Sequence, residues 1–135
     1  MKLIGLDVGT RTIGIAIGFP ENHLTQPICT LKRQSVKKDV PKILEICRQQ
    51  KITSVVVGLP LELDGTEGRS ARLARQIGDE IQASTQYDVF YQDERFSTVE
   101  ATHRLREAGK NAKQQRDMID QVAAMVILED YMNAI

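Results

Sequence analysis

Three acidic residues stand where the surrounding pattern makes an exposed acid unexpected. Asp7 ends an apolar run, Glu94 closely follows another, and Asp120 lies at the start of a third. A carboxylate that enters a protein core must be hydrogen-bonded, paired with a cation or bound to a metal. If the three converge, their repulsion requires a cation, and oxygen-only ligands favour Mg²⁺ or Mn²⁺ over Zn²⁺. Carboxylate-held magnesium suits phosphoryl transfer, because it activates water and stabilises the leaving oxygen.

Each acid also has a simpler interpretation. Asp7 could cap the turn at Gly9 through its side chain, which is a common use of Asp. Glu94, between Asp93 and Arg95, could belong to a solvated loop. Asp120 could be a first-turn acid favoured by the helix dipole. Because convergence is not visible in the spacing, the spacing alone leaves both interpretations open.

Basic residues are the second group with a possible chemical role. Lys+Arg and Asp+Glu both number 18, so the net charge is zero and a globally basic nucleic-acid binder is excluded. Phosphate affinity would therefore require local clusters, and six basic residues against two acidic ones lie from Arg95 to Arg116. The candidate phosphate contacts are Arg11, Arg95, Lys110, Lys113 and Arg116. Further clusters occur at 32–38 and 69–75, and solvated helix faces are the simpler interpretation of all these runs.

The composition limits the architecture and the compartment. A chain of 135 residues with 41% hydrophobic side chains is expected to form one domain with a sizeable core. The two cysteines, Cys29 and Cys47, lack metal or redox spacing and are expected to be reduced thiols. No run is long enough for a signal peptide or a membrane span, so we expect a cytosolic protein without membrane contact.

The hydrophobic pattern predicts strands that alternate with helices after an initial hairpin. A turn with a positive-φ residue is expected at Gly9–Arg11. Glycines at 14 and 18 leave one face of the second strand nearly bare, which indicates a close approach or a bulge. Capping signals place helix starts at Asp39 and Ser97, and a basic loop is expected at Lys110–Arg116. The expected strands are 2–8, 12–19, 28–31, 54–58 and 89–91, and the expected helices are 39–50, 69–84, 97–108 and 117–132.

This order predicts an α/β protein with a mixed central sheet flanked by helices. Strand ends in such sheets gather at one edge, where ligands usually bind. We therefore expect Asp7 and Glu94 at this edge. The small residues Ala123 and Ala124, one turn after Asp120, predict that its helix packs closely on the sheet.

Four sequence blocks closely resemble the YqgF/RuvX-type family and span nearly the whole chain in the family's order. They are LDVGTRTIGIA from residue 6, VVGLPLELDGTE from residue 56, DERFSTVEA from residue 93 and IDQVAAMVIL from residue 119. The resemblance implies a ribonuclease H-like fold and a catalytic, metal-binding set of Asp7, Glu94 and Asp120. Asp93 is the alternative to Glu94. Phe96 and Ser97 stand where many members have Leu and Thr.

The activity that this resemblance implies is a Mg²⁺- or Mn²⁺-dependent endonuclease acting on structured nucleic acid as a monomer or homodimer. The expected substrate is the 5′ end of the pre-16S ribosomal RNA, and resolution of Holliday junctions in branched DNA is the alternative. Two other classes remain open. One is a non-catalytic RNA-binding or transcription-associated module. The other is an ATPase of the actin and sugar-kinase kind, which shares the Asp-x-Gly-Thr motif but needs two such domains.

Overall fold

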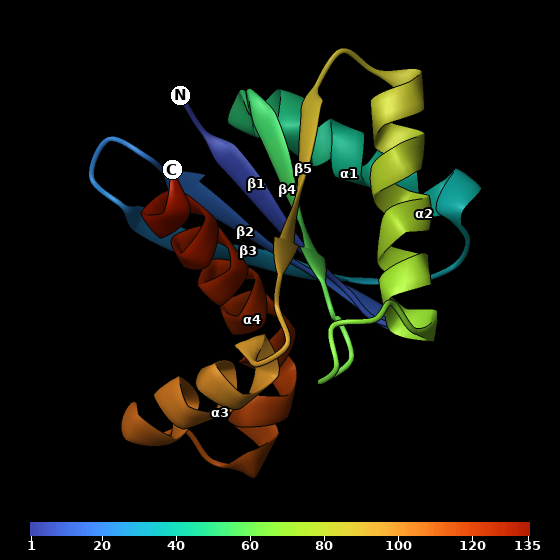
Figure 1. Ribbon diagram of the computed structural model, residues 1–135. Helices are drawn as coiled ribbons and strands as arrows, with labels where there is room; N and C mark the ends of the chain where they lie inside the picture. Colours follow the sequence, from blue (N-terminus) through green and yellow to red (C-terminus); the bar gives the residue numbers. More distant parts are fainter.

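Five strands form a mixed sheet in the order β3-β2-β1-β4-β5, with helices on both faces (Figure 1). The computed structural model describes residues 1–135. The strands are β1 Leu3–Val8, β2 Thr12–Phe19, β3 Leu24–Lys32, β4 Ser54–Leu59 and β5 Asp88–Asp93. The helices are α1 Val36–Gln50, α2 Arg69–Ser84, α3 Ser97–Glu107 and α4 Ala112–Ala134.

The first three strands form an antiparallel meander, and β4 and β5 continue the sheet in parallel with β1. The carboxyl ends of β1, β4 and β5 therefore lie at the same edge. Asp7 belongs to the end of β1, and Glu94 directly follows β5. The predicted fold class and the expected position of these two acids at one edge are confirmed.

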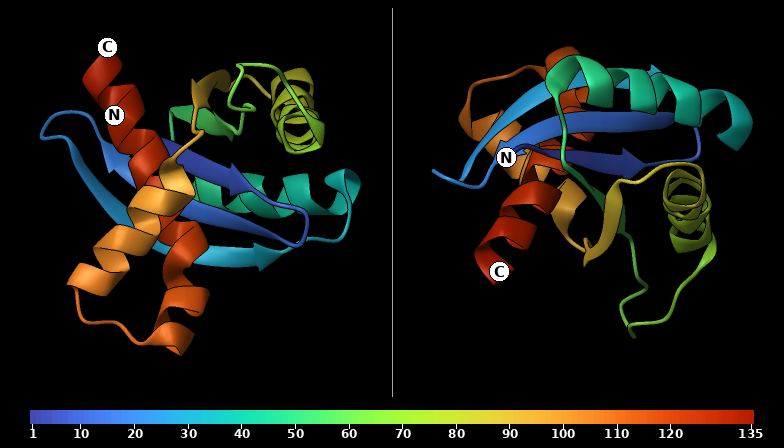
Figure 2. Two further views of the ribbon diagram at one scale, coloured as in Figure 1. Left: turned by 60° about the horizontal axis from the view of Figure 1, so that its bottom comes forward. Right: turned by 90° about the horizontal axis from the view of Figure 1, so that it is seen from above.

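One face of the sheet carries large branched side chains and packs against α1 and α2. Ile13, Ile15 and Ile17 of β2 belong to this main core, with Val55 and Val57 of β4. The alternation of strand side chains places these residues on one side and the glycines between them on the other. Figure 2 shows α1 and α2 together on this side of the sheet.

The opposite face carries small residues, and helix α4 packs directly against it. A Cβ added at Gly5 would lie 2.5 Å from Cγ of Leu128, and one added at Gly14 would collide with the main chain of Asp120. The bare face of β2 is therefore covered by a helix, and the register of β2 and β3 also shifts between Ile15 and Ala16. The close approach that the glycine spacing indicated is confirmed, whereas the irregularity lies in β3, where Ile28 is the extra residue, and not at the glycines of β2.

Several expected element boundaries are wrong for identifiable reasons. Helix α1 begins at Val36, because Ser35 caps it and accepts from the amide of Lys38. Asp39 lies inside the helix, buried against Arg33. Strand β3 is longer than expected because it pairs with β2 along its length. The Gly9–Arg11 turn contains no positive-φ residue.

The last two helices also begin differently from the expectation. Ser97 is not a cap, because its hydroxyl donates to Glu94. Asn111 and Gln114 form a capping box, so α4 begins at Ala112 and the expected basic loop is mostly helix. Helix α3 packs beside the first half of α4, and the pair projects from the sheet (Figure 2). None of the helices is both long and apolar enough to cross a membrane.

Candidate active site

Asp7 and Asp120 are brought together by the absence of a side chain at Gly14. Asp7 of β1 is paired with Gly14 of β2, on the sheet face that α4 covers. Because a Cβ at Gly14 would occupy the position of the Asp120 main chain, only glycine lets α4 approach this closely. Asp120 accordingly lies next to Asp7, and Thr12 Oγ1 donates to Asp120 Oδ2 at 2.5 Å.

Glu94 reaches the same face from the end of β5. Its side chain lies over Gly58 of β4, where an added Cβ would be 2.7 Å from the Glu94 carboxyl carbon. Glu94 is only 6% exposed. Ser97 Oγ donates to Oε2 at 2.6 Å, whereas Oε1 is buried without any hydrogen-bond partner. A buried carboxylate oxygen without a partner is costly in a folded protein.

Negative charge is concentrated around Asp7. Burial raises the pKa of Asp7 well above its usual range, and the nearby charge of Asp120 raises it further. Burial likewise raises the pKa of Glu94, and the charge of Asp7 adds to this effect. Asp7 therefore lies between the other two acids. Without a cation, burial disfavours the charged forms of Asp7 and Glu94, whose carboxyl groups lie within hydrogen-bonding reach of each other.

The residues present fit a hard divalent cation. All three donors are carboxylates, no Cys or His belongs to the set, and one buried oxygen of Glu94 has no partner. Such donors suit Mg²⁺ or Mn²⁺. The three side chains do not already form a ready-made three-ligand group. Asp7 instead forms one close pair with Asp120 and another with Glu94.

The geometry excludes the simpler interpretations of the three acids. The β1–β2 turn is closed by its backbone, because Gly9 N donates to Thr12 O at 2.8 Å, and Asp7 does not cap it. Glu94 is buried, so it is not part of a solvated loop. Asp120 lies well inside α4 and is not a first-turn acid. Asp93 is exposed and bound to Arg95, so Glu94 is the carboxylate beside Asp7.

The candidate phosphate contacts fall into two groups. The guanidinium of Arg95 already has partners within the protein, because it donates to Asp93 at 2.8 Å and to the Leu63 carbonyl at 3.3 Å. Arg11, Lys113 and Arg116 are exposed. Lys113 and Arg116 lie in the first two turns of α4, seven and four residues before Asp120, so they share one face with it.

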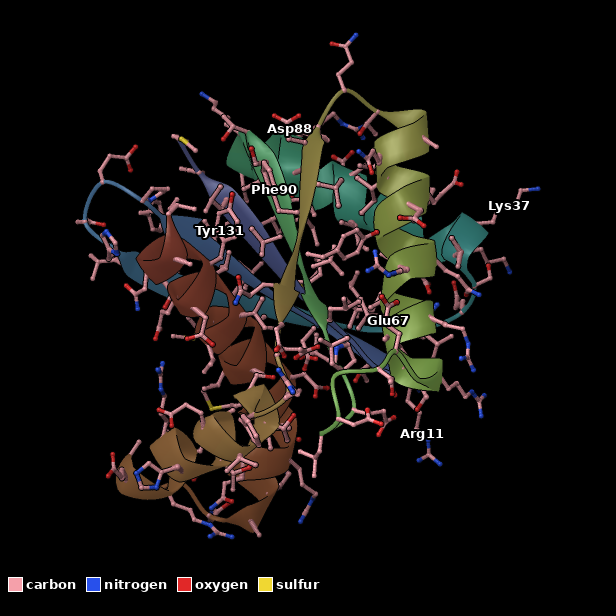
Figure 3. The ribbon with its side chains drawn as sticks, in the orientation of Figure 1. Arg11, Lys37, Glu67, Asp88, Phe90 and Tyr131 are labelled. Carbon is pink, nitrogen blue, oxygen red and sulfur yellow. The ribbon has the colours of Figure 1, made fainter.

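The other basic residues are placed as follows. Arg11 extends from the β1–β2 turn near the start of α2 and Glu67 (Figure 3). Lys110 lies in the turn before α4 and is partly buried. Arg104 binds Glu129 at 2.7 Å, so the positive excess on α3 is smaller than the sequence indicates.

A cavity of about 510 Å³ adjoins the site on the side of Glu94. Its lining includes Glu94, Arg95, Phe96, Ser97 and Asp130. The largest cavity, about 670 Å³, lies between α1 and α2 and contains none of the three acids. Of the three acids, only Glu94 lines the cavity of about 510 Å³, and the partnerless oxygen belongs to this residue.

The sequence interpretation missed the polar residues that hold the acids. Ser97 was assigned to a helix cap, and Thr12 received no role, although each donates to one acid. Gly58 was treated as the end of a strand, whereas it provides the space for Glu94. The signal for Gly58 was its position as the only residue without a side chain in the run Val55–Leu59.

A model of the RuvX family, described as Holliday junction resolvase, matches residues 1–134. The chain belongs to the RuvX family. A relative from Myxococcus xanthus, provisionally named a pre-16S rRNA nuclease, is 40% identical over 134 residues, covering 99% of this chain and 89% of the relative. A second relative, from Clostridium botulinum, carries the same name and is 34% identical over 135 residues. The match covers 100% of this chain and 98% of that relative.

A solved structure of RuvC from T. thermophilus in complex with a Holliday junction has the same fold as this RuvX-family chain. The TM-score is 0.58 at 15% identity, with 99% of this chain and 94% of that chain covered. The ribonuclease H-like fold that the sequence implied is thereby confirmed.

Proposed function

We propose that this protein is an endonuclease that hydrolyses phosphodiester bonds in structured nucleic acid, with Asp7, Glu94 and Asp120 as its catalytic carboxylates. The observation that carries the proposal is the position of Asp7 between buried Glu94, which has a partnerless oxygen, and partly buried Asp120. A cluster of like charges serves no purpose in a scaffold, because each buried charge costs stability. Membership of the RuvX family supports the same activity.

In the proposed mechanism, the acids would hold a divalent cation, which when bound would supply charge for the leaving oxygen and a nucleophilic water. Thr12 fixes Asp120 through its hydroxyl, and Ser97 fixes one oxygen of Glu94. Each acid is thus left with oxygen atoms free for other ligands. Gly14 and Gly58 keep the space above the sheet open for them.

Binding of the substrate would use cations outside the acid cluster. Arg11, Lys113 and Arg116 are exposed, and two of them share a helix face with Asp120. Contacts of this kind hold the phosphate backbone without reading bases. Arg95 is assigned a structural part instead, since Asp93 and the Leu63 carbonyl already occupy it. Lys110 is retained as a weaker candidate.

The substrate we propose is the 5′ end of the pre-16S ribosomal RNA, which the names of relatives support. Holliday junctions are the second candidate, favoured by the description of the family model. We also propose that the protein acts as a monomer or homodimer in the cytosol. The free thiols of Cys29 and Cys47 suit such a reducing compartment.

Two other classes fit less well. A binding module without catalysis would not need the three acids on one face. An ATPase of the sugar-kinase kind would need a second domain.

The experiment that separates the two substrates uses labelled pre-16S fragments and four-way DNA junctions under the same conditions. We expect Mg²⁺-dependent cleavage of the RNA at defined positions and slower cleavage of the junction. Symmetrical cutting of the junction with intact RNA would favour the alternative. Tight binding of either substrate with no cleavage by the wild-type protein would indicate the non-catalytic module.

A further inference from the structure

Large apolar side chains that face solvent gather near the acid cluster. Seven are exposed in the whole chain, and Met1 and Ile135 are simply its ends. Leu24 belongs to the β2–β3 hairpin, and Phe90 is only 39% exposed because it packs on Tyr131 (Figure 3). The other three belong to two segments that meet at the carboxyl edge of the sheet.

These three residues are Leu63, Phe96 and Val99, which we term the apolar rim. Phe96 is 64% exposed although it lies two residues from buried Glu94, and it lines the cavity that contains Glu94. Val99 is 68% exposed, three residues further on, and therefore lies on the same side of α3.

Arg95 links the two segments of the rim. Its guanidinium binds Asp93 in its own segment and donates to the carbonyl of Leu63, at the tip of the loop between β4 and α2. Figure 1 shows this loop below the carboxyl ends of β4 and β5. The loop is itself folded by Asp64, which accepts from the Thr66 amide at 2.9 Å. The apolar rim is thus held in place by polar contacts.

The rim continues into a shallow groove on the outer face of α3. A hollow of about 340 Å³ is lined by Val99 together with Thr98, Thr102, His103 and Arg106. Hydroxyls and a guanidinium suit phosphate and sugar groups, whereas Phe96 and Val99 present only apolar surface. Apolar surface lies here beside a guanidinium and hydroxyl groups and next to the cavity that contains Glu94. This combination suits a nucleotide whose base is out of the helical stack.

We propose that the apolar rim receives an unpaired nucleobase next to the scissile phosphate, with Phe96 as its stacking surface. This inference rests on the proposed nuclease function and narrows its substrates. The protein would act where bases are already unpaired, as in bulges, single-stranded joints or branch points, and poorly on continuous duplex. Stacking on an aromatic ring tolerates any base, so the rim would select structure and not sequence.

A second copy of the chain is the other occupant to consider for the rim. The charge distribution favours nucleic acid, because the groove beyond Val99 carries Arg106 and hydroxyl groups and is not a continuous apolar face. A copy seated on Phe96 would also cover the cavity beside Glu94. The test below therefore includes the oligomeric state.

The test measures binding of two RNA hairpins of equal length and charge, one with a three-nucleotide bulge and one fully paired, each with a fluorescent label. Binding is followed in Ca²⁺, which we expect to allow binding without cleavage. We expect Phe96→Ala to weaken binding of the bulged hairpin by on the order of tenfold and to leave the paired hairpin within about twofold. Phe96→Tyr should retain the preference. Leu24→Ala, at an exposed apolar site on the far hairpin, is the matched control and should change neither affinity.

Three results would overturn the inference. The first is that Phe96→Ala reduces the affinity for both hairpins equally, and the second is that it reduces the affinity for neither. The third is that Phe96→Ala changes the sedimentation of the protein, which would show that the rim is a self-association surface. The outcome for the proposed function is read separately, from cleavage in Mg²⁺ by the wild-type protein. Binding that depends on Phe96, without cleavage, would support the role of the apolar rim and contradict the proposed nuclease function. Cleavage that depends neither on the bulge nor on Phe96 would support the nuclease function and contradict the role of the rim.

Discussion

Asp7 and Glu94 are crowded in the protein without a cation, because burial and the charge of a neighbouring carboxylate raise the pKa of each. The same crowding creates the demand for a divalent cation. The residues that are best for the proposed chemistry are therefore unfavourable for folding. Substitutions that keep the shape and remove the charge separate these two effects.

We predict that Asp7→Asn, Glu94→Gln and Asp120→Asn each abolish cleavage while leaving the metal-free protein folded. Removal of one like charge should hold or raise the free energy of unfolding, by at most on the order of 1–2 kcal/mol. Circular dichroism and urea unfolding in EDTA measure the stability, and gel assays measure cleavage. A variant that keeps near-wild-type turnover would remove its residue from the proposed mechanism.

The raised pKa values of Asp7 and Glu94 predict a pH dependence of stability in EDTA. In the folded state these carboxyls hold their protons at pH values where the unfolded chain has released them, from about pH 4 upward. The folded state therefore binds more protons, and the free energy of unfolding should fall as pH rises through the raised values. Urea unfolding at about pH 5 and about pH 8 should show this fall in the wild type and a smaller one in Asp7→Asn. Equal slopes in the two proteins would contradict this explanation.

At the scale of the elements, glycines decide where the acids meet. We predict that Gly58→Ala greatly reduces cleavage, since its Cβ would collide with Ile127 Cδ1 and lie 2.7 Å from the Glu94 carboxyl carbon, so both side chains would have to shift. Gly18→Ala is the matched control on the same face, because its Cβ would meet Leu128 and Met132 at an ordinary 3.5 Å. Cleavage and thermal unfolding should be nearly unchanged in the control. Full activity of Gly58→Ala would show that the position of Glu94 is not critical.

The basic start of α4 is the second element with a separable role. We predict that changing Lys110, Lys113 and Arg116 together to Ala weakens binding to RNA and DNA of any sequence. The slope of log affinity against log salt should fall by roughly one unit for each basic side chain that binds a phosphate in the wild type. Turnover at saturating substrate should change far less than in the acid variants. The measurement is a salt titration of binding in Ca²⁺. Equal slopes for the wild type and the triple variant would indicate that the nucleic acid instead binds along Arg11 and the start of α2.

The elements also show what a sequence can and cannot predict here. The alternation of isoleucine and glycine in β2 is local, so it correctly indicated that something packs on the bare face. Ser97 misled the interpretation because a serine before Glu100 has the pattern of a helix cap, and only the tertiary fold brings Glu94 within reach of its hydroxyl. Lys113 and Arg116 were assigned to a loop because their basic run masks the capping signal of Asn111 and Gln114.

For the whole molecule, the sheet order brings together segments that are far apart in the sequence. Thr12 and Asp120 are 108 residues apart, and their hydrogen bond is possible only because β2 lies beneath α4. No local pattern contains that information, so the acid cluster could be expected from the sequence only through the family resemblance. The apolar rim was not foreseen either, because exposure of Phe96 is a property of the folded chain.

The central claim is that the three carboxylates act through a divalent cation. The most direct test is cleavage of a labelled pre-16S fragment by wild-type protein freed of metal, with Mg²⁺, Mn²⁺, Ca²⁺ or excess EDTA added. We predict cleavage with Mg²⁺ or Mn²⁺, binding with little cleavage in Ca²⁺, and none in EDTA, since Ca²⁺ aligns water and leaving group poorly. Full turnover in EDTA, with the protein confirmed to be metal-free, would contradict the claim.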